Sequence, residues 1–259
     1  MRYIIYFLVA ITSTTAGGLT GMGGGVVIKP VLDALNDFNA VTIGVLSSFT
    51  VFTMAVVSIL RHIRQKTHMD WGRLLPLSAG ALLGGIAGEK LLVFTAADMA
   101  NNHVLIVQNI LLAVMVACIF MYMLNKHRIR PLGLQGLPAT VSAGVFLGVL
   151  SSFLGIGGGP ANVALLIYLF ALNTKAATVA SLLTILFSQG AKLLSIALSQ
   201  GFSSHNLGLL PAMLVGAVIG GHLGALLNKK LSERWVDVSF NAMQLIVLAI
   251  CLLNILRLM

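Results

Sequence analysis

Hydrophobic residues dominate the chain in long runs that are separated by short polar loops. A run of about 20 apolar residues is long enough to cross the ~30 Å hydrocarbon core of a bilayer as a helix. Six such runs are present, at 40–60, 74–95, 104–124, 176–198, 207–227 and 238–256. The pattern predicts an all-α, polytopic membrane protein.

Two further apolar regions, 3–35 and 137–172, are too long for one span. A glycine cluster interrupts each of them, Gly21-Met22-Gly23-Gly24-Gly25 in the first and Gly155-Ile156-Gly157-Gly158-Gly159 in the second. Glycine readily adopts backbone conformations that end a helix. Each region is therefore expected to form a glycine-broken hairpin, either re-entrant or with limbs of unequal length.

The two glycine clusters begin 134 residues apart, at Gly21 and Gly155, and shorter matches repeat at nearly the same spacing. Leu74-Leu75-Pro76 resembles Leu209-Leu210-Pro211, and Ala40-Val41-Thr42 resembles Ala176-Ala177-Thr178. The chain is therefore interpreted as two membrane repeats, 1–130 and 131–259, within one integral membrane domain. The first segment has the composition of a signal peptide, but its counterpart at 137–154 favours a permanent part of the fold.

The distribution of basic residues predicts how the halves are oriented. If each broken hairpin returns to the side from which it enters, the loops 61–73, 125–136, 172–175 and 228–237 share one side. These loops hold eleven lysines and arginines, against Arg2, Lys90 and Arg257 opposite. If each hairpin instead crosses once, the same tally becomes nine against five. The positive-inside rule therefore favours inverted-topology repeats with the basic loops in the cytoplasm and both termini outside.

Composition excludes several classes of protein. The chain is 58% hydrophobic and 9% charged, with a mean hydropathy of +0.99, which a soluble domain does not reach. The net charge of +9 lies mostly in short loops, so no nucleic-acid partner is expected. Cys118 and Cys251 have no metal-ligand spacing, and no HExxH, GxSxG or GxxxxGK[ST] motif is present. Neither an enzyme nor a bound cofactor is expected.

The glycine breaks are candidate anion sites. The helices that restart after them, from Val26 and from Pro160, would each direct backbone N–H groups and a positive dipole end toward the break. In inverted halves, two such ends face one midplane site. The alternative is close helix packing, because Gly17, Gly21 and Gly25 also have small-xxx-small spacing. For the regular seams Gly80/Gly84/Gly88 and Gly216/Gly220/Gly224, packing is the favoured interpretation.

Two lysines lie inside apolar segments, where a charge is expensive and usually marks a transport pathway. Lys192 belongs to a polar stripe on one helical face, with Gln189 flanking it, and snorkelling to the helix end is its alternative role. The stripe consists of Ser181, Thr184, Ser188, Lys192, Ser195 and Ser199. Lys29 comes one turn after Gly25, so it is able to reach back to the break or to pair with Asp33.

The candidate substrate-binding residues follow from these features. They are Gly23, Gly24, Gly25, Lys29, Gly157, Gly158, Gly159, Asn162, Thr178, Ser181, Ser188, Gln189 and Lys192.

The sequence resembles the TauE/SafE sulfite-exporter family, also called the sulfonate-uptake permease family. The resemblance rests on Gly17-x3-Gly21-x-Gly23-Gly24-Gly25-x4-Pro30-x-Leu32, its echo at 154–159, the Ala-x-Thr stretches and the doubled layout across nearly the whole chain. It implies a multi-pass plasma-membrane transporter, bacterial or archaeal, for sulfur-containing anions such as sulfite, sulfonates or sulfoacetate. The second motif departs from the first by placing Pro160 directly after its glycines.

We therefore expect a secondary transporter that binds a small sulfur-containing anion between the two breaks and works by alternating access. An anion channel and a non-transporting membrane scaffold or sensor are the alternatives. Candidate partners are the anion, the lipid bilayer, a coupling proton or sodium ion, and a second copy in a homodimer. The substrate, the direction of transport and the coupling ion are not fixed by the sequence.

Overall fold

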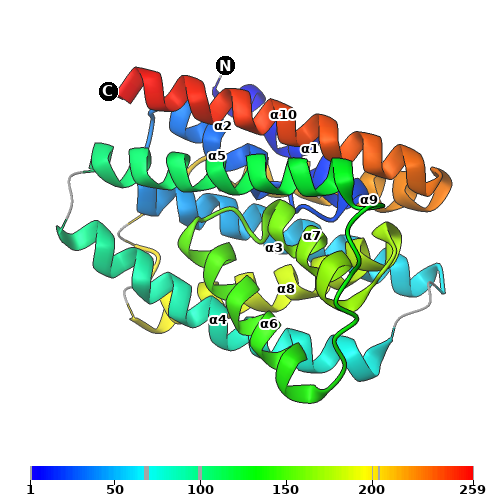
Figure 1. Ribbon diagram of the computed structural model, residues 1–259. Helices are drawn as coiled ribbons and strands as arrows, with labels where there is room; N and C mark the ends of the chain where they lie inside the picture. Colours follow the sequence, from blue (N-terminus) through cyan, green and yellow to red (C-terminus); the bar gives the residue numbers. More distant parts are fainter. Residues whose placement is uncertain (1, 67–69, 99–100, 200, 204, 259) are drawn as a thin grey trace.

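The computed structural model describes residues 2–66, 70–98, 101–199, 201–203 and 205–258. The regular elements in these ranges are helices (Figure 1). They are α1 (Arg2–Thr20), α2 (Gly25–Leu35), α3 (Ala40–Arg64), α4 (Trp71–Asp98), α5 (Asn101–Asn125), α6 (Leu137–Phe153), α7 (Gly159–Phe170), α8 (Thr174–Ser199), α9 (Leu210–Lys230) and α10 (Glu233–Leu258). Within the described ranges, seven helices are long and apolar enough to cross a membrane. The prediction of an all-α polytopic membrane protein is confirmed.

Both long apolar regions divide at their glycine clusters into two helices, α1 and α2 in the first and α6 and α7 in the second. The limbs differ in length. With 19 residues, α1 is itself a candidate span, which the six expected runs did not include. The others are shorter, with 11 residues in α2, 17 in α6 and 12 in α7.

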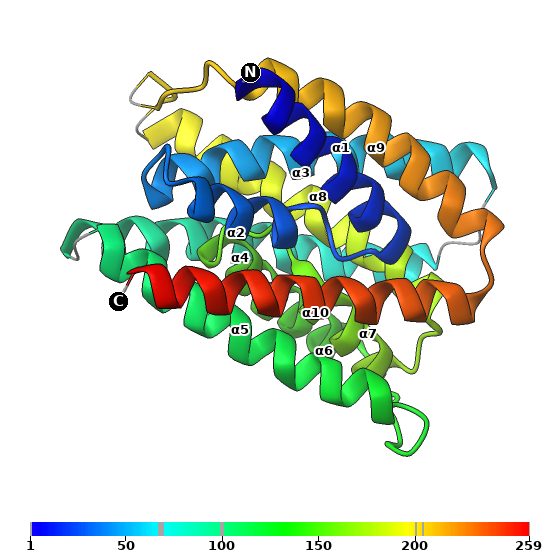
Figure 2. The same cartoon turned by 90° about the horizontal axis from the view of Figure 1, so that it is seen from above.

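The two hairpins open toward opposite ends of the helix bundle. In the first, Tyr6 near the start of α1 donates a hydrogen bond to Asp37 just after α2, at 2.8 Å. In the second, the segment before α6 bonds to the end of α7, from Leu134 N to Leu169 O at 2.7 Å. α10 links the two ends, because it begins beside the end of α7 and finishes beside the end of α2 (Figure 2).

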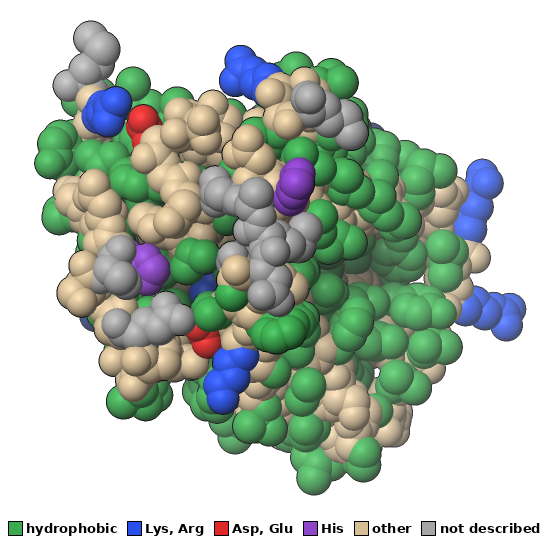
Figure 3. Space-filling view, turned by 90° about the vertical axis from the view of Figure 1, so that its left-hand side faces the viewer, with side chains coloured by type: hydrophobic (Ala, Val, Ile, Leu, Met, Phe, Trp, Pro, Cys, Tyr) green, Lys and Arg blue, Asp and Glu red, His purple; other side chains and the backbone are tan. Residues whose placement is uncertain are grey.

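The two ends differ in their charged residues. The end at which α1 begins and α10 finishes carries scattered charged side chains among hydrophobic and uncharged ones (Figure 3). The other end gathers the described parts of the basic loops, with Arg73 near Gln135 and Lys175 near Lys229. Which membrane face each end meets, and the inverted relation of the halves as repeats, stay predictions.

The glycine seams pack each hairpin against the other half of the chain. In α4, Cβ atoms on Gly80, Gly84 and Gly88 would lie 2.1–2.4 Å from the carbonyl oxygens of Val141, Val145 and Val149 in α6. In α9, Gly216, Gly220 and Gly224 approach Phe7, Ile11 and Thr15 in α1 in the same way. Each contacted residue of α6 comes 134 positions after the matching contacted residue of α1 (141 − 7, 145 − 11, 149 − 15). The prediction that these seams serve packing is confirmed, since only glycine permits so close an approach.

The helices that follow the hairpins start with the same cap. Asn39 accepts a hydrogen bond from Thr42 N at 2.8 Å and starts α3, and Asn173 accepts one from Ala176 N at 2.8 Å and starts α8. An asparagine at this position satisfies one of the N–H groups that the first turn leaves without an intrahelical partner. The cap fixes where α3 and α8 begin, and these two helices flank the breaks.

Candidate functional site

The two breaks turn with matching backbone geometry. The φ angles are 77° at Gly21 and 69° at Gly23 in the first break, and 66° at Gly155 and 70° at Gly157 in the second. Side chains with a Cβ rarely adopt these positive values. The helices restart at Gly25 and Gly159, one residue earlier than the predicted starts at Val26 and Pro160.

The breaks touch each other directly. A Cβ atom on Gly25 would lie 2.2 Å from the carbonyl oxygen of Ile156, and one on Gly23 would lie 2.9 Å from the carbonyl oxygen of Gly157. Ordinary van der Waals contact starts at 3.4 Å. Gly25 and Ile156 therefore leave no room for a ligand between them, and a binding site has to lie beside this contact.

The polar face of α8 runs past both breaks. Near its start, Thr178 donates to Thr20 O at 3.2 Å and Ser181 donates to Gly21 O at 2.6 Å. Nearer its end, Gln189 donates to the Ser151 hydroxyl at 2.8 Å, and Ser188 lies 3.4 Å from the same hydroxyl. These four predicted residues are fully buried. They attach α8 to the first break and to the end of α6.

Lys29 and Lys192 converge beside Gly155. A Cβ atom on Gly155 would lie 3.6 Å from Cδ and Cε of Lys29 and 3.4 Å from Cα of Gly44, and a Cβ on Gly44 would lie 3.5 Å from Nζ of Lys192. The lysines are 2% and 1% exposed. The structure thus brings together two buried cations from different halves, on one side of the second break.

The two lysines have different partners. Lys29 forms the ion pair with Asp33 that the sequence left open, with Nζ to Oδ2 at 2.8 Å, and Asn109 also donates to this oxygen. Lys192 donates to the carbonyl oxygen of Ser152 at 3.3 Å and forms no direct ion pair among the described residues. It is buried rather than snorkelling, so its charge faces the protein interior.

Several buried polar atoms near the breaks have no hydrogen-bond partner among the described residues. They include both amide atoms of Asn162, the hydroxyls of Ser47 and Ser152, and Oε1 of Gln189. A buried polar group without a partner costs about 1–3 kcal/mol, so native proteins leave few of them. Asn162 lies against the second break, since a Cβ on Gly158 would be 2.5 Å from its Nδ2. Such groups are suited to bind a ligand's oxygens.

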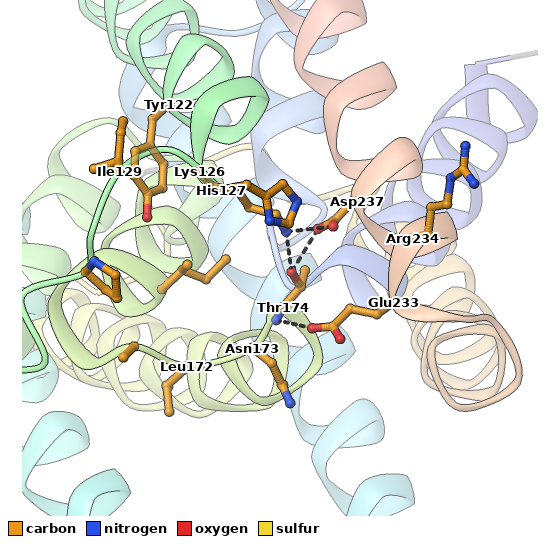
Figure 4. Close-up of a pocket in the computed structure, with 13 residues that line it drawn as sticks. Tyr122, Lys126, His127, Ile129, Leu172, Asn173, Thr174, Glu233, Arg234 and Asp237 are labelled. Carbon is orange, nitrogen blue, oxygen red and sulfur yellow. Dashed lines mark hydrogen bonds and ion pairs between the residues drawn. The ribbon is translucent and has the colours of Figure 1, made fainter.

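A pocket of about 610 Å³ opens at the basic-loop end and is separate from these residues. Figure 4 shows its centre, where Lys126 Nζ lies 2.6 Å from Asp237 and 2.9 Å from the Thr174 hydroxyl. Glu233 accepts a hydrogen bond from Thr174 N at 2.7 Å. These side chains connect the end of α5 to the starts of α8 and α10.

Sequence reasoning missed part of this site. Gly44 was not singled out, although it separates Lys192 from Gly155. Asn109 and Asn254, which bond to each other at 3.2 Å behind the Lys29–Asp33 pair, were also missed. The sequence did contain a signal for them, since each is an amide inside an apolar run, 104–124 or 238–256. An amide in hydrocarbon needs a hydrogen-bond partner, which predicts a contact with another polar residue.

Comparison with known proteins then identifies the family. The family model described as "Sulfite exporter TauE/SafE" matches residues 6–252. The chain belongs to the TauE/SafE family. It is 26% identical over 265 residues to the probable membrane transporter protein YunE of Bacillus subtilis, covering 91% of this chain and 92% of that protein. It is 24% identical over 251 residues to the probable membrane transporter protein MJ0441 of Methanocaldococcus jannaschii, covering 92% and 90%. No solved structure matches it.

TauE/SafE membership confirms the resemblance that the doubled glycine motif indicated. Together with the seven candidate spans among the described residues, it makes this chain a multi-pass membrane transporter. The roles of the individual site residues stay predictions.

Proposed function

We propose that this chain is a secondary transporter for small sulfur-containing oxyanions in the plasma membrane, and that the anion binds beside the second glycine break. The observation that carries the proposal is the convergence of Lys29 and Lys192 on Gly155 in a buried interior. Buried cations in membrane segments are costly and mark ion or substrate pathways. The family description, which refers to sulfite, supports the class of anion.

In this proposal Lys192 supplies the main counter-charge. Its Nζ contacts a carbonyl oxygen rather than a carboxylate, so an arriving oxyanion offers it a stronger partner. Lys29 is already paired with Asp33 and contributes a shared positive field. Ser152 and Asn162 have buried polar atoms without partners in the described part of the chain, and these atoms are suited to bind the remaining oxygens.

Alternating access is supported by how the hairpins are arranged. They open toward opposite ends and touch each other at their breaks, so each hairpin is placed to lead to the site from one end. The candidate residues Lys29, Ser181, Ser188 and Lys192 are at most 2% exposed. A site closed to both ends fits a transporter that occludes its substrate, and it disfavours the channel alternative. Rocking of the two halves about the breaks would open it to each end in turn.

Binding to the detergent-purified protein tests this function. Sulfite, sulfoacetate and methanesulfonate are titrated against the wild type and Lys192→Met, with choline chloride as the ionic-strength control. Asp70→Asn, which changes an exposed loop charge, is the matched variant. Saturable binding of at least one sulfur anion is expected, weakened in Lys192→Met alone. If none of the three anions binds, or if Lys192→Met binds as the wild type does, the proposed site is wrong.

A further inference from the structure

Glu89 lies in α4, one helical turn beyond a tight contact with α8. A Cβ on Gly85 would lie 2.4 Å from the carbonyl oxygen of Ser188 and 3.0 Å from its Cα, so the two backbones touch there. The two helices run in the same direction (Figure 1). Four residues further along each helix are Glu89 and Lys192, and the Ser195 hydroxyl donates to Glu89 Oε2 at 2.9 Å. Glu89 is therefore a neighbour of the proposed anion site.

The carboxylate is buried, with 4% of Glu89 exposed, and it forms no direct ion pair among the described residues. Its one hydrogen bond there comes from a neutral hydroxyl. A buried carboxylate without a direct cation is costly, and it either depends on a nearby charge or takes up a proton. Glu89 is therefore sensitive to the charges around it.

The helix packing places one buried lysine of α8, Lys192, at the level of Glu89. It lies one turn after Ser188, as Glu89 lies one turn after Gly85, and Lys29 of α2 reaches the same region beside Gly155. α6 carries no ionisable side chain. α5 contributes His103, which is exposed, and Lys90 on α4 itself is also exposed. The basic residues of α3, Arg61, His62 and Arg64, lie in its last turn at the basic-loop end.

An oxyanion at Lys192 competes with Glu89 for that single positive charge. Once Lys192 faces the anion, its positive charge no longer compensates the Glu89 carboxylate. The carboxylate then binds a proton, because a buried negative charge without a cation is costly. The linkage is reciprocal, because a protonated Glu89 leaves Lys192 free for the anion. Proton and anion therefore strengthen each other's binding at this site.

We propose that Glu89 carries the proton that couples this transporter to the proton gradient, so that one proton moves with each anion. The inference rests on the proposed function and names its coupling ion. The proton comes from water on the side to which the site is open, binds a Glu89 carboxylate oxygen, and returns to water on the other side when the anion leaves. Because anion binding needs the protonated carboxyl group, the apparent affinity for the anion falls as pH rises.

Proteoliposomes containing Glu89→Gln test the proposal with radiolabelled methanesulfonate, which stays ionised across the pH range used. Two rates are measured: exchange against unlabelled methanesulfonate without a gradient, and uphill accumulation driven by an alkaline interior. The wild type is expected to do both. Glu89→Gln, a neutral mimic of the protonated state, is expected to exchange but to lose gradient-driven accumulation and the pH dependence of half-saturation. Asp70→Asn should behave as the wild type.

The outcomes separate this inference from the function on which it rests. Glu89→Gln accumulating methanesulfonate as the wild type does would overturn the coupling role, and so would wild-type accumulation that does not respond to the pH gradient. Wild-type protein that exchanges none of the sulfur anions would instead remove the proposed function itself. If Glu89→Gln does not fold, proton uptake on anion binding to the wild type in weak buffer decides: one proton per anion supports the role, and none refutes it.

Discussion

Replacing Gly25 with alanine tests the contact between the two breaks most selectively. The added methyl would lie 2.2 Å from the carbonyl oxygen of Ile156 and 2.6 Å from its carbonyl carbon. Ordinary contact starts at 3.4 Å, so the breaks would have to separate by 1.2 Å (3.4 − 2.2). Gly25 is not among the residues with positive φ, so the substitution strains the contact and not the local backbone.

Overpacking of this kind costs about 1–3 kcal/mol, and the upper part of that range applies because the obstacle is backbone. The strain falls on the arrangement that holds Gly155 beside the two lysines, so at 1.4 kcal/mol for each factor of ten we expect Gly25→Ala to lower methanesulfonate exchange by about tenfold or more. The unfolding temperature of the detergent-purified protein should fall by about 2–4 °C per kcal/mol. Gly72→Ala is the matched control, since a methyl there meets the Asp70 carboxylate at the ordinary contact distance of 3.5 Å. Wild-type exchange by Gly25→Ala would refute the claim that contact between the breaks supports transport.

Three other substitutions probe separate parts of the account. Gly158→Val introduces a β-branched residue at a φ of 106°, and we expect it to abolish exchange. An immunoblot should still detect the protein in the membrane fraction, and normal exchange would contradict the prediction. Asn162→Leu removes a buried amide that has no partner among the described residues, so thermal stability should rise by about 1–3 kcal/mol and half-saturation should rise as well. An unchanged half-saturation would assign Asn162 to packing alone. Asp237→Asn removes the carboxylate that faces Lys126 in Figure 4 and should alter the maximal exchange rate but not half-saturation, because it loosens the helix ends and not the site. A changed half-saturation would place Asp237 in binding.

The sequence predicted the features that depend on local pattern. The apolar runs located the long helices, and the glycine clusters located both hairpin breaks to within a residue of where α2 and α7 start. The glycine seams were correctly assigned to packing, because four-residue spacing places them on one helical face. The prediction did not identify α1 as a membrane span of its own, because it assigned the whole region 3–35 to one glycine-broken hairpin.

The arrangement of the site depended on contacts between distant segments, which no local pattern encodes. The pairing of Lys29 with Asp33 was readable from their four-residue spacing, but the position of Lys192 beside Gly44 and Gly155 was not. The sequence predicted a site between the breaks, whereas the site is proposed beside them, because Gly25 and Ile156 are in contact. The position of Glu89 near the proposed site likewise follows from the packing of α4 against α8 one turn earlier.

The central claim is that Lys192 binds an oxyanion that this chain carries across the membrane. Exchange of radiolabelled methanesulfonate in proteoliposomes, measured over a range of concentrations for the wild type and for Lys192→Met, tests it most directly. We predict saturable exchange in the wild type and a half-saturation about tenfold higher or more in Lys192→Met, because loss of a charged hydrogen-bond donor costs about 1.5–3 kcal/mol. Exchange that does not saturate, or an unchanged half-saturation in Lys192→Met, would contradict the account.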